Sequence, residues 1–202
     1  MLRFLVYNKF KFRKWEKLTP QQRLEVFQEL EKIQAKKLKR PMAIVEPKNM
    51  PQNAKGLFSS QSNTIFLNTN YFFDDNLRFD GMFTLFHEGR HAYQHFVCFS
   101  TKRFGFFSKA RKWKKNFSGY ISGFGDEYSF YSMQPVERDA NLYAFRRLKE
   151  FDFRFRYDSC FRATLDFEEY CLDSDKFKAK KDLGFFYRQK ISNKTKQNAE
   201  NK

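Results

Sequence analysis

The sequence predicts an α+β fold in which a small β-sheet packs on two helices. Two strand-like runs within 57–67 alternate in hydrophobicity and are separated by Ser60–Asn63, which is typical of a β-hairpin. Residues 82–97 form an apolar stretch long enough for a helix of about four turns. Pro135 begins a later segment with helical phase, at a position where its missing N–H costs nothing. The order is therefore a hairpin, a first helix and a later second helix.

The amino-terminal region, residues 1–41, is expected to hold an arm and one helix. Basic and aromatic residues alternate over 9–17, which indicates an edge strand or an extended arm. Thr19 followed by Pro20 predicts a helix start with a threonine N-cap, and Gln22 stands at the position that completes a capping box. A short strand is predicted at 43–46, before the hairpin.

His87, Glu88 and His91 form an HExxH motif inside the apolar helix. Residues four apart lie one turn above each other on a helix, so both imidazoles can bind one zinc ion while the glutamate projects to the same site. The chain has only three histidines, and all of them lie in this segment, which makes a chance match uncommon. The alternative is an amphipathic helix whose histidines hydrogen-bond in the core.

A catalytic zinc site takes three protein ligands, so a third is needed. His95 lies eight residues beyond His87, about 12 Å along an unbroken helix, and cannot reach the same ion. Glu137, near the start of the later helix, is the best candidate. Ala140 and Ala144 share its face, and their small side chains let two helices approach closely. The alternative is an ordinary solvated glutamate, which the helix dipole favours in a first turn.

An HExxH helix followed by ExxA(N/D) on a later helix resembles the gluzincin-type zinc metallopeptidases. The nearest resemblance is to the ImmA/IrrE-like zincins and related zincins of phages and other mobile genetic elements. The segments that carry it are 65–68, 86–94 and 135–141. The resemblance implies a minimal zincin-like domain, with a small sheet packed on the HExxH helix and on a second metal-ligand helix.

This resemblance implies a zinc metallopeptidase that hydrolyses a peptide bond of a specific cytosolic protein. Zinc would be held by His87, His91 and Glu137, and Glu88 would act as the general base. In the resembled group, the edge strand of the sheet can hold an extended peptide by main-chain pairing. Three side chains are candidates for the donor that stabilises the tetrahedral oxyanion: Tyr128, Tyr131 and His95.

The chain is strongly basic, with a formal net charge of +16 over 202 residues. That charge favours acidic partners such as nucleic acid or a membrane surface, although an AT-rich genome also produces lysine-rich proteins. The three cysteines form no CxxC pair and imply no disulfide framework. No apolar run reaches the roughly 20 residues of a membrane-spanning helix. A cytoplasmic protein is expected, with one domain over 1–188 and a disordered polar tail over 189–202.

Residues 99–131 are predicted to be a basic insertion between the two helices. Aromatic residues are interleaved with lysine and arginine over Lys102–Lys115, which suits a nucleic-acid strand or a membrane interface. The alternative is a solvated loop with a few aromatic side chains packed into the core. The glycine-rich stretch 119–125 is predicted to be a mobile flap beside the cleft.

Two other functions remain open at this point. One is a basic nucleic-acid-binding protein on an inactive or structural zincin scaffold, and the other is a metal-dependent hydrolase of a non-peptide amide. The presence of Glu88 favours an enzyme, because a purely structural zinc site needs no general base.

Overall fold

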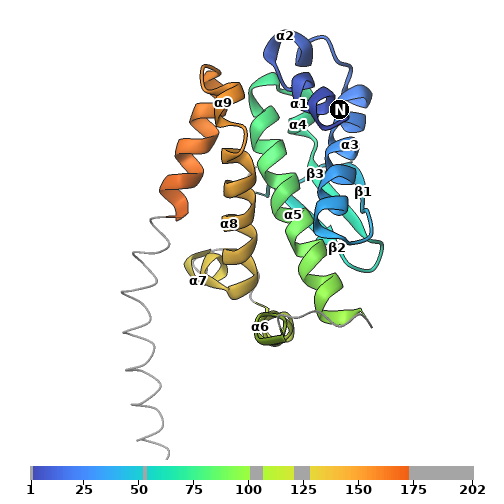
Figure 1. Cartoon of the computed structure of the whole chain (residues 1–202), viewed down its shortest axis with the longest axis vertical. Coiled ribbons are helices and arrows are strands. Elements are labelled where there is room, and N and C mark those ends of the chain that lie inside the picture. Colours follow the sequence, from blue (N-terminus) through green and yellow to red (C-terminus); the bar gives the residue numbers. More distant parts are fainter. Residues whose placement is uncertain (1, 52–53, 101–106, 121–127, 173–202) are drawn as a thin grey trace, which may run out of the picture.

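The structure is a computed structural model that describes residues 2–51, 54–100, 107–120 and 128–172. Helices form most of this part of the chain, and a three-stranded mixed sheet lies at one side (Figure 1). The α+β class predicted from the sequence is confirmed.

The sheet has the order β1-β3-β2, with β3 (Thr64–Asn68) in the centre. β1 (Ile44–Lys48) pairs with it in parallel, and β2 (Gly56–Ser59) pairs with it in antiparallel fashion. Asn63, in the turn before β3, has the left-handed φ of 49° that asparagine tolerates better than most residues. The predicted hairpin and the short strand before it are both confirmed.

The first long helix is α3 (Pro20–Leu38), and its start follows the predicted capping box. Thr19 Oγ1 accepts a hydrogen bond from Gln22 N at 3.2 Å, and Gln22 Oε1 accepts one from Thr19 N at 2.9 Å. The helix ends at Lys39, whose backbone is left-handed with a φ of 54°.

The prediction of a strand or extended arm over 9–17 is wrong. These residues belong to α1 (Leu2–Lys9), α2 (Phe12–Trp15) and the turns beside them. Phe10 and Trp15 are both fully buried, with their rings stacked at 4.9 Å. Two turns of helix let both aromatic side chains enter the core together, and this tertiary burial outweighs the local alternation.

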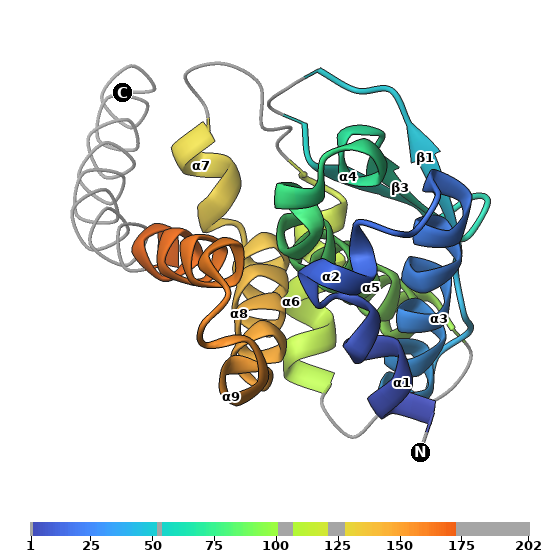
Figure 2. The same cartoon turned by 90° about the horizontal axis from the view of Figure 1, so that it is seen from above.

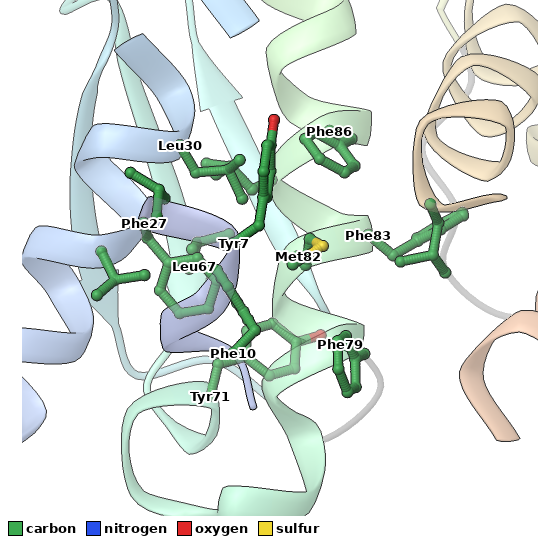
Figure 3. Close-up of a cluster of buried hydrophobic side chains, with 14 of the residues drawn as sticks. Tyr7, Phe10, Phe27, Leu30, Leu67, Tyr71, Phe79, Met82, Phe83 and Phe86 are labelled. Carbon is green, nitrogen blue, oxygen red and sulfur yellow. The ribbon is translucent and has the colours of Figure 1, made fainter. Parts of the chain in front are cut away.

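The central element is α5 (Arg78–Phe99), which follows α4 (Asn70–Phe73) and the 3-10 turn η1 (Asp75–Leu77). The helix predicted over the apolar stretch 82–97 is confirmed, and it extends beyond that stretch at both ends. Figure 2 shows α3 and the sheet on one side of α5 and α8 on the other. Figure 3 shows its inner face against the amino-terminal helices and the sheet, with these α5 residues labelled: Phe79, Met82, Phe83 and Phe86.

The chain continues through α6 (Phe107–Phe117) and α7 (Tyr128–Met133) to α8 (Pro135–Lys149). It closes with α9 (Asp152–Phe155) and a helical stretch over 159–172. The second helix predicted to begin at Pro135 is confirmed. The alternative of a loop for the basic insertion is wrong where α6 lies, because this segment is helical, whereas the burial of Trp113 agrees with the aromatic side chains that this alternative placed in the core.

Two expectations cannot be compared with the fold. The predicted tail, 189–202, and most of the predicted flap, 121–125, lie outside the described residues. Within the described part of the chain, no helix combines the length and apolar character needed to span a membrane.

Candidate metal centre

The two helices that carry the HExxH and ExxA motifs pack along each other (Figure 1). His87 and His91 lie one turn apart on α5, and Glu137 lies in the first turn of α8. Ala140 and Ala144 are fully buried on the face of α8 that also carries Glu137, as predicted. These small side chains let the two helices approach closely enough for the three polar side chains to meet.

The three side chains converge on one point. His87 Nε2 and His91 Nε2 are 3.0 Å apart. His87 Nε2 lies 3.3 Å from Oε2 of Glu137, and His91 Nε2 lies 3.3 Å from Oε1. Two ligands that bind a tetrahedral zinc ion at about 2.0–2.1 Å lie about 3.3–3.4 Å from each other, so the observed spacings fit a metal. Among the described residues, these three form a group that could hold a metal ion.

Glu137 has a carboxylate oxygen that a metal would satisfy. Its side chain is fully buried, and Oε2 accepts no well-formed hydrogen bond; its polar neighbour in the described structure is His87 Nε2 at 3.3 Å. A buried carboxylate oxygen without a well-formed hydrogen bond is costly, and a bound cation removes that cost. The alternative of an ordinary solvated first-turn glutamate is therefore wrong for this residue.

Gln94 fixes the orientation and tautomer of His91. Its Nε2 donates to the carbonyl oxygen of Val136 at 2.9 Å and to a carboxylate oxygen of Asp139 at 3.0 Å. The amide oxygen therefore faces His91 Nδ1, at 2.9 Å, and can only accept from it. Nδ1 then carries the proton, and Nε2 of the neutral ring presents a lone pair to the metal position.

Asp139 of α8 connects this helix to α5 and α6. It forms ion pairs with Arg90 of α5 at 2.7 Å and with Lys109 of α6 at 2.5 Å. Burial opposes ionisation of Asp139, but these cations and Gln94 outweigh it and lower the pKa of the carboxyl group. Arg90 and Gln94 of α5 therefore position the second helix, α8, through their contacts with Asp139 and Val136.

The electrostatics of the site favour a positive charge between the histidines and Glu137. Burial lowers the pKa of His91, but Glu137 outweighs this effect and raises the pKa to about 9. Burial also opposes ionisation of Glu137, yet the two histidines hold its pKa well below the usual range. A divalent cation at the same point would receive the same stabilisation from the carboxylate.

Glu88 lies beside the candidate metal ligands and is buried against β2. Burial raises its pKa, and His87 and His91 offset part of that rise. The backbone of Phe58 in β2 forms a hydrogen bond with the carboxylate. A Cβ atom on Gly56 would lie 2.6 Å from Thr84 Cγ2 and 3.2 Å from Glu88 Cγ, so only glycine lets β2 approach this closely.

Tyr120 is a site residue that the sequence did not identify. Its hydroxyl donates to Glu137 Oε1 at 2.6 Å, and its ring lies 6.0 Å from that of Tyr131 in an edge-on arrangement. The two tyrosines are also hydrogen-bonded to each other. Burial and the nearby Glu137 raise the pKa of both phenols, so both remain donors near neutral pH.

The three predicted oxyanion donors have different places in the structure. Tyr131 lies next to Tyr120 and supports it. His95 lies among aromatic rings, 4.6 Å from the ring of Phe99, and burial lowers its pKa. The side chain of Tyr128 is outside the described residues. The only sequence signal for Tyr120 was its place in the glycine-containing stretch predicted to lie beside the cleft.

Asn116 of α6 is a second residue that the sequence did not identify. Its Oδ1 accepts a hydrogen bond from Val136 N at 3.1 Å, and its Nδ2 donates to Gln134 Oε1 at 2.9 Å. It therefore caps the start of α8, one residue before the metal-ligand glutamate. No local pattern in α6 indicates this long-range capping role.

Comparisons with family models, with curated proteins and with solved structures give no match to this chain. The chemistry of the site is therefore inferred from its geometry.

We expect the protein to bind one zinc ion per chain through His87, His91 and Glu137. Alanine at any one of the three should remove tightly held metal, because the two remaining ligands cannot form a stable site. Metal content after dialysis, compared with helical content by circular dichroism, measures this effect. His95→Ala is the control and should keep its zinc. If His95→Ala loses zinc while Glu137→Ala keeps it, the ligand assignment is wrong.

Replacing Gln94 tests whether the support of His91 matters for affinity. Gln94→Leu should weaken zinc binding about 10–100-fold, because loss of an outer partner frees the imidazole ring to rotate and change tautomer. One ion per chain should still bind at saturating zinc. Competition with a chromophoric chelator measures the affinity. Gln21→Leu, the same change at an exposed position in α3, should have no effect, and equal losses in the two variants would contradict the proposed support.

Proposed function

We propose that this chain is a zinc-dependent metallopeptidase of the gluzincin type. The observation that carries this proposal is the convergence of His87, His91 and Glu137 beside a buried Glu88. Histidine and carboxylate ligands suit zinc, and the order of the two motifs matches the resemblance seen in the sequence.

The ligand set supports a catalytic site over a structural one. Structural zinc sites close all four positions with protein side chains, whereas catalytic sites keep one for water or substrate. In the described part of the chain, the metal-binding group comprises three residues. The fourth neighbour is Glu88, whose raised pKa suits a base that works near neutral pH.

The proposed reaction is hydrolysis of a peptide bond by water. When bound, zinc supplies the Lewis acidity that makes water nucleophilic near neutral pH and polarises a carbonyl group. Glu88 accepts the proton of the attacking water and then delivers it to the leaving amine. With substrate bound, the single O–H of Tyr120 would turn from Glu137 Oε1 to the oxyanion of the tetrahedral intermediate and donate its hydrogen bond there, with Tyr131 beside it.

The position of β2 favours a peptide over another amide as substrate. β2 is an edge strand, because its one strand neighbour in the described sheet is β3. Through Gly56 and Phe58, this edge lies directly beside Glu88. An extended peptide that adds to an exposed sheet edge gains main-chain hydrogen bonds, whereas a small amide would gain none.

Glu88→Gln should keep the fold and the zinc but lose hydrolysis by a factor of about 10²–10⁴, because the amide is nearly isosteric and cannot act as a base. New protein termini should therefore be found in cells that express the wild type and be missing in cells that express the variant. Glu25→Gln, at an exposed position of α3, is the matched control and should behave as the wild type. The same new termini in Glu88→Gln cells would remove the peptidase mechanism, whatever the metal content.

Tyr120→Phe should lower the turnover of a peptide that spans such a cleavage site by about 10²–10³, which is the typical effect of losing one oxyanion donor. At saturating zinc the Michaelis constant should change little, although the zinc affinity should also fall, because Glu137 loses the hydrogen bond from Tyr120. His95→Phe is the control, since this side chain lies among aromatic rings, and it should keep full turnover. A loss of zinc affinity in Tyr120→Phe without a loss of turnover at saturating zinc would instead make Tyr120 a positioning residue for Glu137.

A further inference from the structure

Helix α6 (Phe107–Phe117) has one face that belongs to the core. Trp113 is buried, and Ala110 and Phe117 are partly buried beside it. These side chains pack against Val97 of α5 and Val136 of α8. Figure 1 shows this helix across the lower ends of α5 and α8. The described part of its apolar face therefore packs against the protein.

The outer face of α6 is a dense group of positive charges. Five basic side chains lie within seven residues, and all are exposed: Lys109, Arg111, Lys112, Lys114 and Lys115. The sequence from 99 to 125 contains no acidic residue. Among the described residues, one ion pair joins this helix to a carboxylate, and it is formed by Lys109 and Asp139.

Three of these cations repel one another without compensation from the described part of the protein. Arg111 and Lys115 are four residues apart, and Lys112 and Lys115 are three apart, so they lie on neighbouring turns. Like charges at these spacings destabilise an isolated helix. An external polyanion would turn this repulsion into attraction. We call Arg111, Lys112 and Lys115 the α6 triad.

We propose that the α6 triad binds the phosphate backbone of single-stranded nucleic acid. A membrane surface is the other common partner of a basic amphipathic helix, but it needs a free apolar face to enter the lipid. Here that face is buried, with Trp113 only 2% exposed. Phosphates need nothing from that face, because they bind to lysine and arginine directly.

The exposed ring of Phe99 favours a single strand over a duplex. Phe99 ends α5 next to α6, is 51% exposed and lies 5.6 Å from the ammonium group of Lys114. Bases of a single strand can stack on such a ring while neighbouring cations bind the phosphates. Bases paired inside a duplex cannot do so.

The proposal is independent of the proposed peptidase. Lys109, Asn116 and Tyr120 hold the metal centre, whereas the α6 triad makes no described contact with it. Binding is therefore measured without any hydrolysis, on the full zinc-loaded chain. The probes are a labelled mixed-sequence DNA strand and the duplex of the same sequence, each titrated at several salt concentrations by fluorescence anisotropy.

The triple variant R111Q/K112Q/K115Q should bind the single strand about 10–100-fold more weakly at low salt. Its log–log salt dependence should be less steep by about 2, because up to three phosphate contacts are lost. The control R13Q/K14Q/K17Q has the same residue types, spacing and charge change on exposed positions near α2, at the other end of the molecule (Figure 1). It should stay within about twofold of the wild type if the face, and not the net charge, binds.

Phe99→Ala tests the stacking contact separately. It should weaken binding of the single strand roughly fivefold or more and leave the salt dependence unchanged, because a base–aromatic contact carries no net charge. Zinc content and circular dichroism, measured for every variant, should equal those of the wild type.

Four outcomes would overturn the proposal. The first is no measurable binding near 50 mM salt, a concentration at which phosphate contacts are strong, and the second is equal weakening of binding by the two triple variants. The third is tighter binding of the duplex than of the single strand, and the fourth is binding to phosphatidylserine vesicles that depends on the α6 triad while oligonucleotide binding does not. The last outcome would assign the face to a membrane.

Discussion

Burial of the Glu137 carboxylate between two imidazoles is the constraint on which the rest of the site depends. A buried carboxylate is costly unless charge and hydrogen bonds compensate it. Compensation here needs the two Nε2 atoms within 3.3 Å, which in turn needs α5 and α8 in close contact. The small residues of α8 permit that contact, and Gln94 turns one imidazole toward the carboxylate. The same arrangement that stabilises the carboxylate also brings three side chains together that could hold one metal ion.

The start of α8 is held from three directions, which explains how a first-turn side chain can be so well fixed. Asn116 of α6 caps the helix, Gln94 of α5 binds the Val136 carbonyl, and Tyr120 binds the glutamate itself. Helix ends usually fray, because their first N–H groups have no partner inside the helix. A metal site built at such an end is only as rigid as these external partners.

The features that the sequence predicted are those set by short-range spacing. The capping box of α3, the β2–β3 hairpin and the HExxH stripe all depend on residues within four or five positions of each other. The errors come from long-range packing. Phe10 and Trp15 form helical turns because Phe27 and Phe79 complete an aromatic core around them. Tyr120 reaches Glu137 from an irregular segment, and no periodic pattern marks such a residue.

Helix α6 carries both exposed cations, which contribute to the net charge of the chain, and residues that contact the elements of the candidate metal centre. The two groups lie on different faces of the helix. Lys109, although half-exposed, pairs with Asp139 of α8, and Asn116 pairs with Gln134 at the N-cap of α8. The outward cations have no such partners in the described structure and do not affect the position of the ligands. The net charge from composition counts the cations with a carboxylate partner and those without one together, and therefore cannot distinguish them. The fold does, because helical phase assigns each residue of one basic segment either to the support of the metal centre or to the surface.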